Sequence, residues 1–162
     1  MKQAAAMSES EQERLLSANA DGRLALVADS FARLTGRPLL ADGPATPRRL
    51  WIAPFVLLAH DAAPDPVFFY GNRRALDLFE MTADQLLRTP SRLSAEPDER
   101  EARARLLDEV GRQGFIANYA GVRVSATGRR FRIEQATVWN LIDAEGRRHG
   151  QAAAFSDWTR LD

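Results

Sequence analysis

Short apolar runs separated by turn residues organise the middle of the chain. Residues 55–59 and 67–70 are two such runs, and the connection between them carries two prolines and two aspartates. Runs of this length with turn residues at both ends are typical of strands. Asn72 follows the second run, and its side chain can accept hydrogen bonds from the free N–H groups of a first helical turn. The pattern therefore predicts two strands followed by a helix over 73–79 that begins at an Asn72 cap.

The last third of the chain has the pattern of strands joined by hairpins. Residues 115–124, 131–141 and 149–155 are predicted strands, and turns that contain glycine separate them. Side chains alternate between the two faces of a strand. Strict alternation along the second of these strands places six residues on one face: Phe131, Ile133, Gln135, Thr137, Trp139 and Leu141.

Helical patterns fill most of the remaining sequence. Capping boxes predict that one helix begins near Ser8 and another at Thr82. A stripe of apolar residues predicts a helix over 24–34, and Pro97 fits the first position of a further helix. Hairpins kept apart from helices predict an α+β fold with one five-stranded antiparallel sheet and helices on one face. The strand at 67–70 is apolar on both sides, so the other face needs cover from the N-terminal helices or from a partner subunit.

A linker is predicted over residues 41–49, which contain two prolines and a glycine. We expect residues 1–40 to form an N-terminal helical extension that packs on the sheet or on a partner. Residues 41–162 are expected to form the main domain. The extension is not treated as a separate domain, because two helices alone bury too little surface to fold.

The composition narrows the class of protein. Among the 162 residues, 22 are basic and 22 acidic, so the net charge is zero, whereas binding to nucleic-acid phosphates needs a basic excess. The chain has no cysteine, which excludes disulfides, thiolate metal sites and cysteine nucleophiles. No apolar run approaches the ~20 residues that span a bilayer, and the N-terminus lacks the apolar core of a secretory signal. We therefore expect no nucleic-acid partner, no membrane association and a cytoplasmic location.

The order of the elements resembles a PAS domain. Several sequence blocks are more similar to the MEKHLA domain, a PAS-related module of stand-alone bacterial proteins and of plant class III homeodomain–leucine-zipper factors; they are residues 55–61, 70–72, 78–80, 90–94, 114–116 and 130–140. The resemblance implies a PAS-like five-stranded sheet that cradles helices, and a sensory or regulatory role. Of the PAS classes, the flavin-adduct class needs a cysteine, which is absent, and the haem class needs an axial histidine on a middle helix. His60 and His149 lie instead at the ends of predicted strands, so no haem or cysteinyl-flavin site is predicted.

In the PAS pattern, the inner face of the sheet and the middle helices enclose a cavity. An apolar hollow with a few polar groups is how small-molecule sites are built. The predicted ligand-binding residues are Tyr70, Leu76, Phe79, Phe115, Tyr119, Phe131, Gln135 and Trp139. Tyr119 and Gln135 favour a ligand, because a buried phenol or amide needs a hydrogen-bond partner. A closely packed core without a cavity is the alternative.

Other polar residues are given structural roles. His60 and Asp61 are adjacent on a predicted strand and so point to opposite faces, and no nucleophile accompanies them; we expect Asp61 to cap the turn and His60 to bond to backbone. No catalytic residue and no metal site is predicted, and the outward-facing Glu134 does not supply the buried carboxylate that an enzyme would need. The arginines at 123, 129, 130, 132, 147 and 148 are expected to form a solvated edge around the hairpins.

Three hypotheses remain at this point, and the third is an enzyme that would use the curved sheet for acid–base chemistry and would need a buried carboxylate facing the cavity. In the first, the protein is a sensory or regulatory module that binds a small organic molecule between sheet and helices. It signals through association, as a homodimer or with a separate partner protein, because the ligand shifts the packing of helices on the sheet. In the second, it is a protein-interaction or homodimerisation module whose core is filled and free of ligand.

Overall fold

The computed structural model describes residues 2–95 and 97–161, without the side chains of residues 2–8, 97–100, 103 and 107. Its helices are α1 (Lys2–Ala18), α2 (Arg23–Thr35), α3 (Pro47–Trp51), α4 (Arg73–Phe79), α5 (Ala83–Leu86), the 3-10 helix η1 (Ser91–Ser94) and α6 (Pro97–Gln113). Its strands are β1 (Val56–Asp61), β2 (Phe68–Gly71), β3 (Phe115–Val124), β4 (Arg130–Ile142), β5 (Arg148–Phe155) and β6 (Asp157–Arg160).

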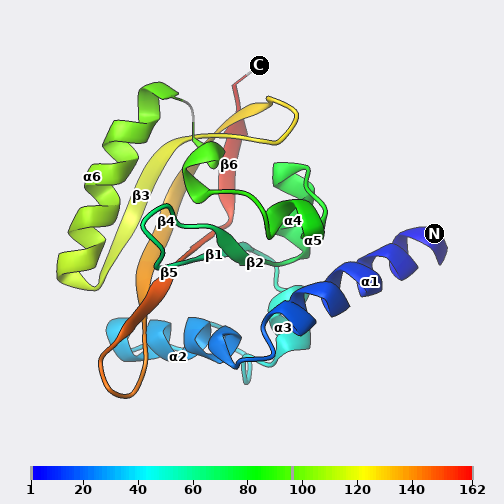
Figure 1. The fold of residues 1–162 in the computed structure, drawn as a ribbon, viewed down its shortest axis with the longest axis horizontal. Helices are drawn as coiled ribbons and strands as arrows, with labels where there is room; N and C mark the ends of the chain where they lie inside the picture. Colours follow the sequence, from blue (N-terminus) through cyan, green and yellow to red (C-terminus); the bar gives the residue numbers. More distant parts are fainter. Residues whose placement is uncertain (1, 96, 162) are drawn as a thin grey trace.

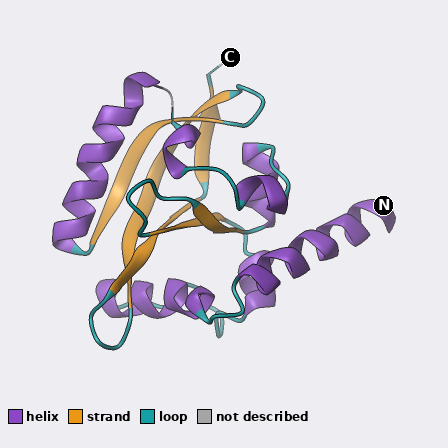
Figure 2. Ribbon diagram, viewed as in Figure 1, coloured by secondary structure: helices purple, strands orange, loops and turns teal. Residues whose placement is uncertain are grey.

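All the strands belong to one antiparallel sheet in the order β2-β1-β5-β4-β3, with β6 paired to β4. The first two strands therefore join the last group through the β1–β5 pair, as the predicted single sheet requires. The sheet has a strand more than predicted, because β6 continues along the edge of β4 that β5 occupies, with Ile133 opposite Trp158. Helices lie on both sides of the strands (Figures 1 and 2).

One face of the sheet is covered by α2, and we call it the α2 face. Trp139 of β4 donates from Nε1 to the backbone oxygen of Val27 at 3.0 Å, and its ring meets Phe31 edge-on at 4.9 Å. Partners on antiparallel strands point their side chains to the same side. Ladder pairs connect Trp139 to Ala152, Ala59 and Tyr70, so all of these share the α2 face.

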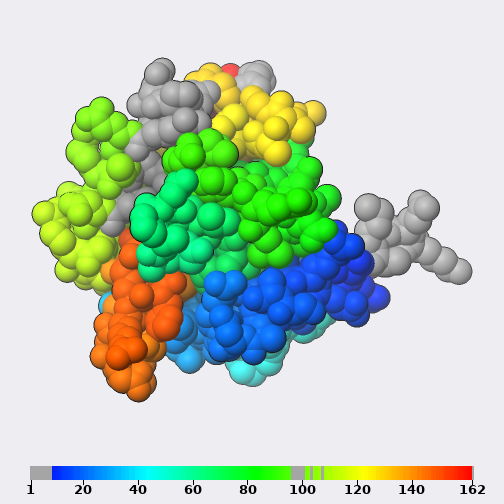
Figure 3. Space-filling model, viewed as in Figure 1, coloured from blue at the N-terminus to red at the C-terminus, as the bar shows by residue number. Residues whose placement is uncertain are grey.

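The opposite face, which we call the cavity face, is covered by α4, α6 and η1. Phe79 at the end of α4 meets Phe131 of β4 edge-on at 5.2 Å. Asn140 of β4 donates from Nδ2 to the backbone oxygen of Val110 in α6 at 2.9 Å. In the space-filling view, the green atoms of the segment that follows β1 fill the centre of the visible surface (Figure 3).

Asn72 caps α4 as predicted and also joins three segments. Its Oδ1 accepts from the backbone N–H of Ala75 in the first turn of α4 and from that of Leu57 in β1, both at 3.1 Å. Its Nδ2 donates to the backbone oxygens of Leu50 and Phe55 at 3.2 and 2.8 Å. The side chain is fully buried, so these bonds hold α3, β1 and α4 together inside the core.

The other predicted caps can be compared directly with the structure. The capping box of Thr82 and Gln85 forms at α5, and Gly36 adopts a left-handed conformation at the end of α2. The helix expected to begin near Ser8 begins earlier, at Lys2. Helix α3 forms inside the predicted linker, where Thr46 accepts from the N–H of Arg49 as its N-cap.

Candidate ligand-binding site

A cavity of about 50 Å³ lies between the cavity face of the sheet and the helices above it. Strands β1, β3, β4 and β5 supply most of its wall, while α4, η1 and α6 supply Phe79, Ser94 and Leu106. The lining is mainly apolar, and its polar side chains are His60, Ser94, Tyr119, Arg123 and Gln151. An apolar hollow with a few convergent polar groups is the usual form of a small-molecule site.

Arg123 is the charged residue of the cavity wall. Its side chain is buried, with an exposed fraction of 7% for the residue, and its guanidinium donates to the backbone oxygen of Val122 at 2.9 Å and to the hydroxyl of Tyr119 at 2.7 Å. Its guanidinium carbon lies 5.3 Å from the centre of the Tyr119 ring. Among the described residues, no carboxylate lies within ion-pair distance of Arg123. Buried charges are usually paired, so an arginine in this state marks a functional candidate.

The lack of a side chain at Gly121 makes room for this pair. Tyr119, Gly121 and Arg123 alternate along β3, so they share its cavity face. A Cβ atom at Gly121 would lie 2.5 Å from the Tyr119 hydroxyl and 3.4 Å from Nη1 of Arg123. The hydroxyl and the guanidinium therefore occupy the space above the glycine, and an alanine there would displace the hydroxyl.

The remaining polar residues of the wall are held by neighbouring groups. His60 contacts the backbone oxygen of Asp61 through Nδ1 at 2.8 Å, and the Asp61 carboxylate accepts from the N–H groups of Ala63 and Val67 in the turn. This is the structural arrangement predicted for the two residues. Gln151 donates to Oδ1 of Asn140 at 3.0 Å, which ties β5 to β4 along the cavity.

Four of the predicted ligand-binding residues lie on the cavity side of the sheet or in the helix that covers it. Phe79 and Tyr119 line the cavity itself. Phe131 packs edge-on against Phe79 and is fully buried. Leu76 is buried in α4 and does not line the cavity. Whether any of these binds a ligand remains a prediction.

Three other predicted residues lie on the wrong face for this cavity. Phe115 and Tyr70 stand in the same row across the sheet as Trp139, so all three belong to the α2 face. Burial raises the pKa of the Tyr70 hydroxyl, which has no hydrogen-bond partner among the described residues. The expectation that these residues face the interior cavity is wrong.

Gln135 was also expected to point inward, and it is exposed. Its φ is +54°, and Asn118 on the neighbouring strand has a φ of +60°, where the ladder between β3 and β4 shifts register. An extra residue of this kind forms a β-bulge and reverses the alternation that follows it. Past Gln135, the cavity face therefore carries Val138 and Asn140, while Trp139 turns to α2.

Arg123 and Gln151 line the cavity but were not among the ligand-binding residues predicted from the sequence. Arg123 was assigned to a solvated edge because other arginines surround the hairpins, yet it is buried. The sequence does carry one signal, since Tyr119, Gly121 and Arg123 have the period of a strand face. Gln151 shares a face with Ala153 and Phe155 by the same period, and no expectation had been drawn from it.

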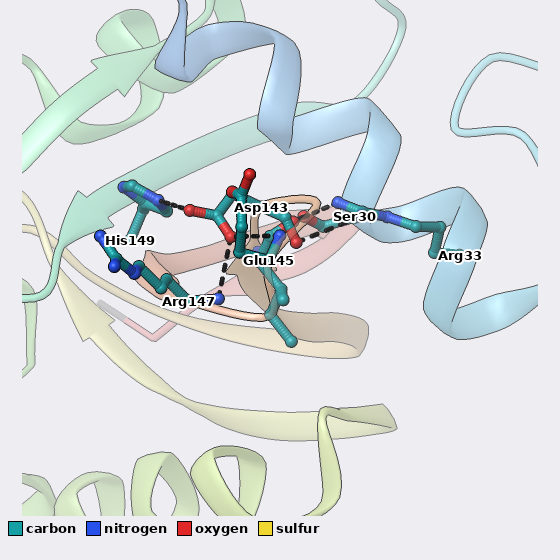
Figure 4. Close-up of polar contacts among 7 residues, drawn as sticks. Ser30, Arg33, Asp143, Glu145, Arg147 and His149 are labelled. Atoms are coloured by element: carbon teal, nitrogen blue, oxygen red, sulfur yellow. Dashed lines mark hydrogen bonds and ion pairs between the residues drawn. The ribbon is translucent and has the colours of Figure 1, made fainter.

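On the far side of the sheet, the β4–β5 hairpin is fastened to α2 (Figure 4). The hydroxyl of Ser30 accepts from the N–H of Ile142 at 2.8 Å, and the Arg33 guanidinium donates to the backbone oxygens of Ile142 and Asp143. The Asp143 carboxylate contacts Nε2 of His149 at 2.7 Å and accepts from the N–H groups of Arg147 and Glu145. Chiefly through the His149 bond, this lowers the pKa of Asp143 to about 2.

No aspartate or glutamate belongs to the described residues that line the cavity, and the described part of the chain holds no cluster of side chains suited to a metal ion. Among the helices of the described residues, none has the length and apolar character needed to cross a membrane.

Comparisons with solved structures identify the fold. Among solved structures, a PAS domain from Colwellia psychrerythraea superposes with a TM-score of 0.59 at 12% identity, covering 70% of this chain and 92% of that one. A light-oxygen-voltage domain from work on a flavin analogue has a TM-score of 0.58 at 16% identity, covering 76% and 89%. These similarities establish a PAS-like α+β fold.

Sequence comparison reaches plant regulators and a domain family. Homeobox-leucine zipper protein ATHB-14 of Arabidopsis thaliana is 31% identical over 94 residues, which is 58% of this chain. The chain spans only 11% of that relative's length. The MEKHLA domain family matches residues 22–160, from the start of α2 to the end of β6. The chain thus belongs to the MEKHLA domain family.

Proposed function

We propose that this protein is a sensory module that binds a small organic molecule in the cavity between the sheet and helices α4 and α6. The observation that carries the proposal is the cavity itself, which is apolar apart from a few polar side chains. The PAS-like fold of a MEKHLA domain supports it. A cytoplasmic location remains a prediction.

The volume of the cavity limits the size of the ligand. A water molecule needs roughly 10–15 Å³ of such volume, so about 50 Å³ holds a few non-hydrogen atoms. Sites for drug-sized ligands measure roughly 300–1,000 Å³. The proposed ligand is therefore a small metabolite, and a flavin-sized group would require the covering helices to move.

Neighbouring residues on the same strands reach both the cavity and α2. Val138 and Ala153 line the cavity, while the adjacent Trp139 belongs to the α2 face; Ala152, opposite Trp139, shares that face and also contributes to the cavity wall. A ligand that favours one position of these strands also favours one position of α2. In this proposal, α1 and α2 report the bound state through association with a second copy or with a separate partner protein.

The proposal is tested by filling the cavity. Ala153→Leu adds side-chain atoms in the cavity wall, whereas Ala104→Leu adds the same atoms at an exposed position of α6. Native mass spectrometry of the purified protein reports bound metabolites and oligomeric state together. We expect wild type and Ala104→Leu to carry the same small molecule and Ala153→Leu to lose it. A folded wild type that carries no ligand, and binds none from a metabolite library in NMR titrations, would instead support a ligand-free interaction module.

A further inference from the structure

We propose that the ligand of this cavity is a short-chain monocarboxylate and that Arg123 binds its carboxylate. The inference rests on the proposed function and names the chemical class of the molecule. It starts from the buried guanidinium in the cavity wall, which two neighbours hold in place and which has no carboxylate partner among the described residues.

The donors of Arg123 are only partly used. One N–H of the guanidinium goes to the Val122 backbone oxygen and one to the Tyr119 hydroxyl. An arginine has further N–H groups in a rigid planar fork, and these have no acceptor among the described residues. Because a planar carboxylate matches this fork and forms strong charge-assisted bonds with it, a carboxylate fits the unused donors well.

Charge balance favours a single negative charge. The described residues that line the cavity include one arginine and no lysine, aspartate or glutamate. A buried arginine without a counter-charge is costly, and one carboxylate neutralises it. A phosphate group carries about −1.5 to −2 charges at neutral pH, as in a phosphorylated side chain, and would leave negative charge buried and uncompensated. The cavity therefore selects a carboxylate over a phosphate.

The size and the apolar lining of the cavity indicate what is attached to the carboxylate of the ligand. A cavity of about 50 Å³ takes a few non-hydrogen atoms. Beyond the arginine, most of the wall is apolar, with Phe79, Ile133 and Phe155 among its residues. The group attached to the carboxylate is therefore a short alkyl or similarly small chain. For a ligand of about four such atoms, the affinity is limited to tens of micromolar or weaker.

The test compares acetate with acetamide, which has the same shape and no charge. Each is titrated into ¹⁵N-labelled full-length protein, and amide shifts of β3 and β5 and the Arg123 Nε–H resonance are followed by NMR. We expect acetate to give saturable shifts at Tyr119, Arg123 and Gln151, with acetamide binding at least 10-fold more weakly.

Variants separate the buried arginine from arginines on the surface. Arg123→Gln removes the charge but keeps a polar side chain, and we expect it to weaken acetate binding about 10- to 100-fold. Arg132→Gln makes the same change at an exposed arginine on β4 and should leave binding unchanged. If Arg123→Gln unfolds the protein, Tyr119→Phe serves instead, because it removes the hydroxyl that holds the guanidinium, and we expect several-fold weaker acetate binding.

The outcomes distinguish the two proposals. Acetamide or another neutral molecule binding in the cavity as well as acetate would overturn the carboxylate assignment and leave the sensory proposal standing. Equal acetate binding by wild type and a folded Arg123→Gln would do the same. If no probe shifts the cavity resonances and native mass spectrometry shows an empty protein, both proposals fail.

Discussion

Replacing Asn72 by alanine should destabilise this protein far more than an ordinary loss of a helix cap. The side chain is fully buried, and its amide uses both N–H donors and accepts two hydrogen bonds at its oxygen. It accepts from two backbone N–H groups and donates to two backbone oxygens. Asn72→Ala removes all of these bonds at once, and it leaves the backbone groups inside the core.

The magnitude follows from the separate contributions. Loss of the cap on the Ala75 N–H costs about 1 kcal/mol. The Leu57 N–H becomes a buried donor without its partner, which costs about 1–3 kcal/mol. The two carbonyl oxygens, of Leu50 and Phe55, add less, because water entering the vacated space can reach them. We expect the free energy of unfolding to fall by about 3 kcal/mol.

Thr82→Ala provides the matched control. Thr82 is also an N-cap whose side chain accepts from a backbone N–H, here that of Gln85, but this bond is exposed. Its loss should cost about 1 kcal/mol. Urea denaturation followed by circular dichroism gives both values, provided that the slope of the transition is unchanged. Equal losses for the two variants would refute the reasoning, since the additional bonds of Asn72 would then contribute nothing measurable.

Asn72→Asp tests the donor half of the same side chain. The substitution keeps an acceptor for Leu57 and Ala75 but places a carboxylate against two backbone oxygens. Burial and these oxygens raise the folded-state pKa of the new carboxyl above the unfolded value of about 3.9. The folded state then binds the proton more tightly, so the stability of this variant falls as the pH rises above about 4. A variant whose stability relative to wild type does not change between pH 4 and pH 7 would contradict this.

Four further variants test the bulge, α2 and the hairpin. Because Gln135 has a φ of +54°, Gln135→Gly should stabilise the protein by up to about 1 kcal/mol in urea denaturation, and Gln135→Leu should leave ligand affinity unchanged in NMR titration, since the side chain is exposed. Trp139→Phe removes the hydrogen bond to the Val27 oxygen and some ring volume, so it should lower the free energy of unfolding by about 1–3 kcal/mol. It should also speed amide hydrogen exchange throughout α2. Unchanged exchange in α2 would show that this residue does not hold the helix in place. The Asp143 carboxylate has a folded pKa of about 2, below its ordinary value of 3.8, so its contribution is complete above about pH 4 and is lost as the pH falls towards 2. Asp143→Asn should therefore lose less stability than wild type on acidification over this range, and identical acid sensitivity of the two proteins would contradict the role of the His149 bond.

Local patterns in the sequence were sufficient for most of the elements. The two apolar runs, the Asn72 cap and the capping box at Thr82 all depend on interactions within a few residues, and each forms as expected. The Thr46-Pro47 start of α3 carried a local signal too, but the two prolines and the glycine within residues 41–49 led to the prediction of a linker. Strand β6 is short and mostly exposed, so its pairing with β4 has no pattern of its own in the sequence.

The cavity residues were harder to predict because they depend on pairing between strands. Strict alternation placed Gln135 and Trp139 on the same face as Phe131, and a bulge near the middle of β4 breaks that alternation. A glutamine gives no sequence signal for a left-handed backbone, so the conformation of Gln135 becomes visible only in the ladder between β4 and β3. The prediction for Arg123 was wrong for a related reason. Arginine is usually exposed, and its burial here depends on the helices that lie across the cavity, which the local sequence does not reveal.

Because of the same bulge, the second half of β4 directs Asn140 to the cavity face, where this side chain bonds to several elements. Beyond it, Asn140 points to the cavity side, where its Oδ1 accepts both from Gln151 in the cavity wall and from Arg148 at the base of the β4–β5 hairpin. Its Nδ2 holds α6 through the Val110 oxygen, and the next turn of the chain is the hairpin that Arg33 fastens to α2. Under the proposed function, a shift of Gln151 on ligand binding would act on the Asn140 amide, which also bonds to α6 and to Arg148 of the hairpin. In the proposed mechanism, Asn140 is therefore the side chain best placed to link the cavity wall to α6 and, through the hairpin, to α2.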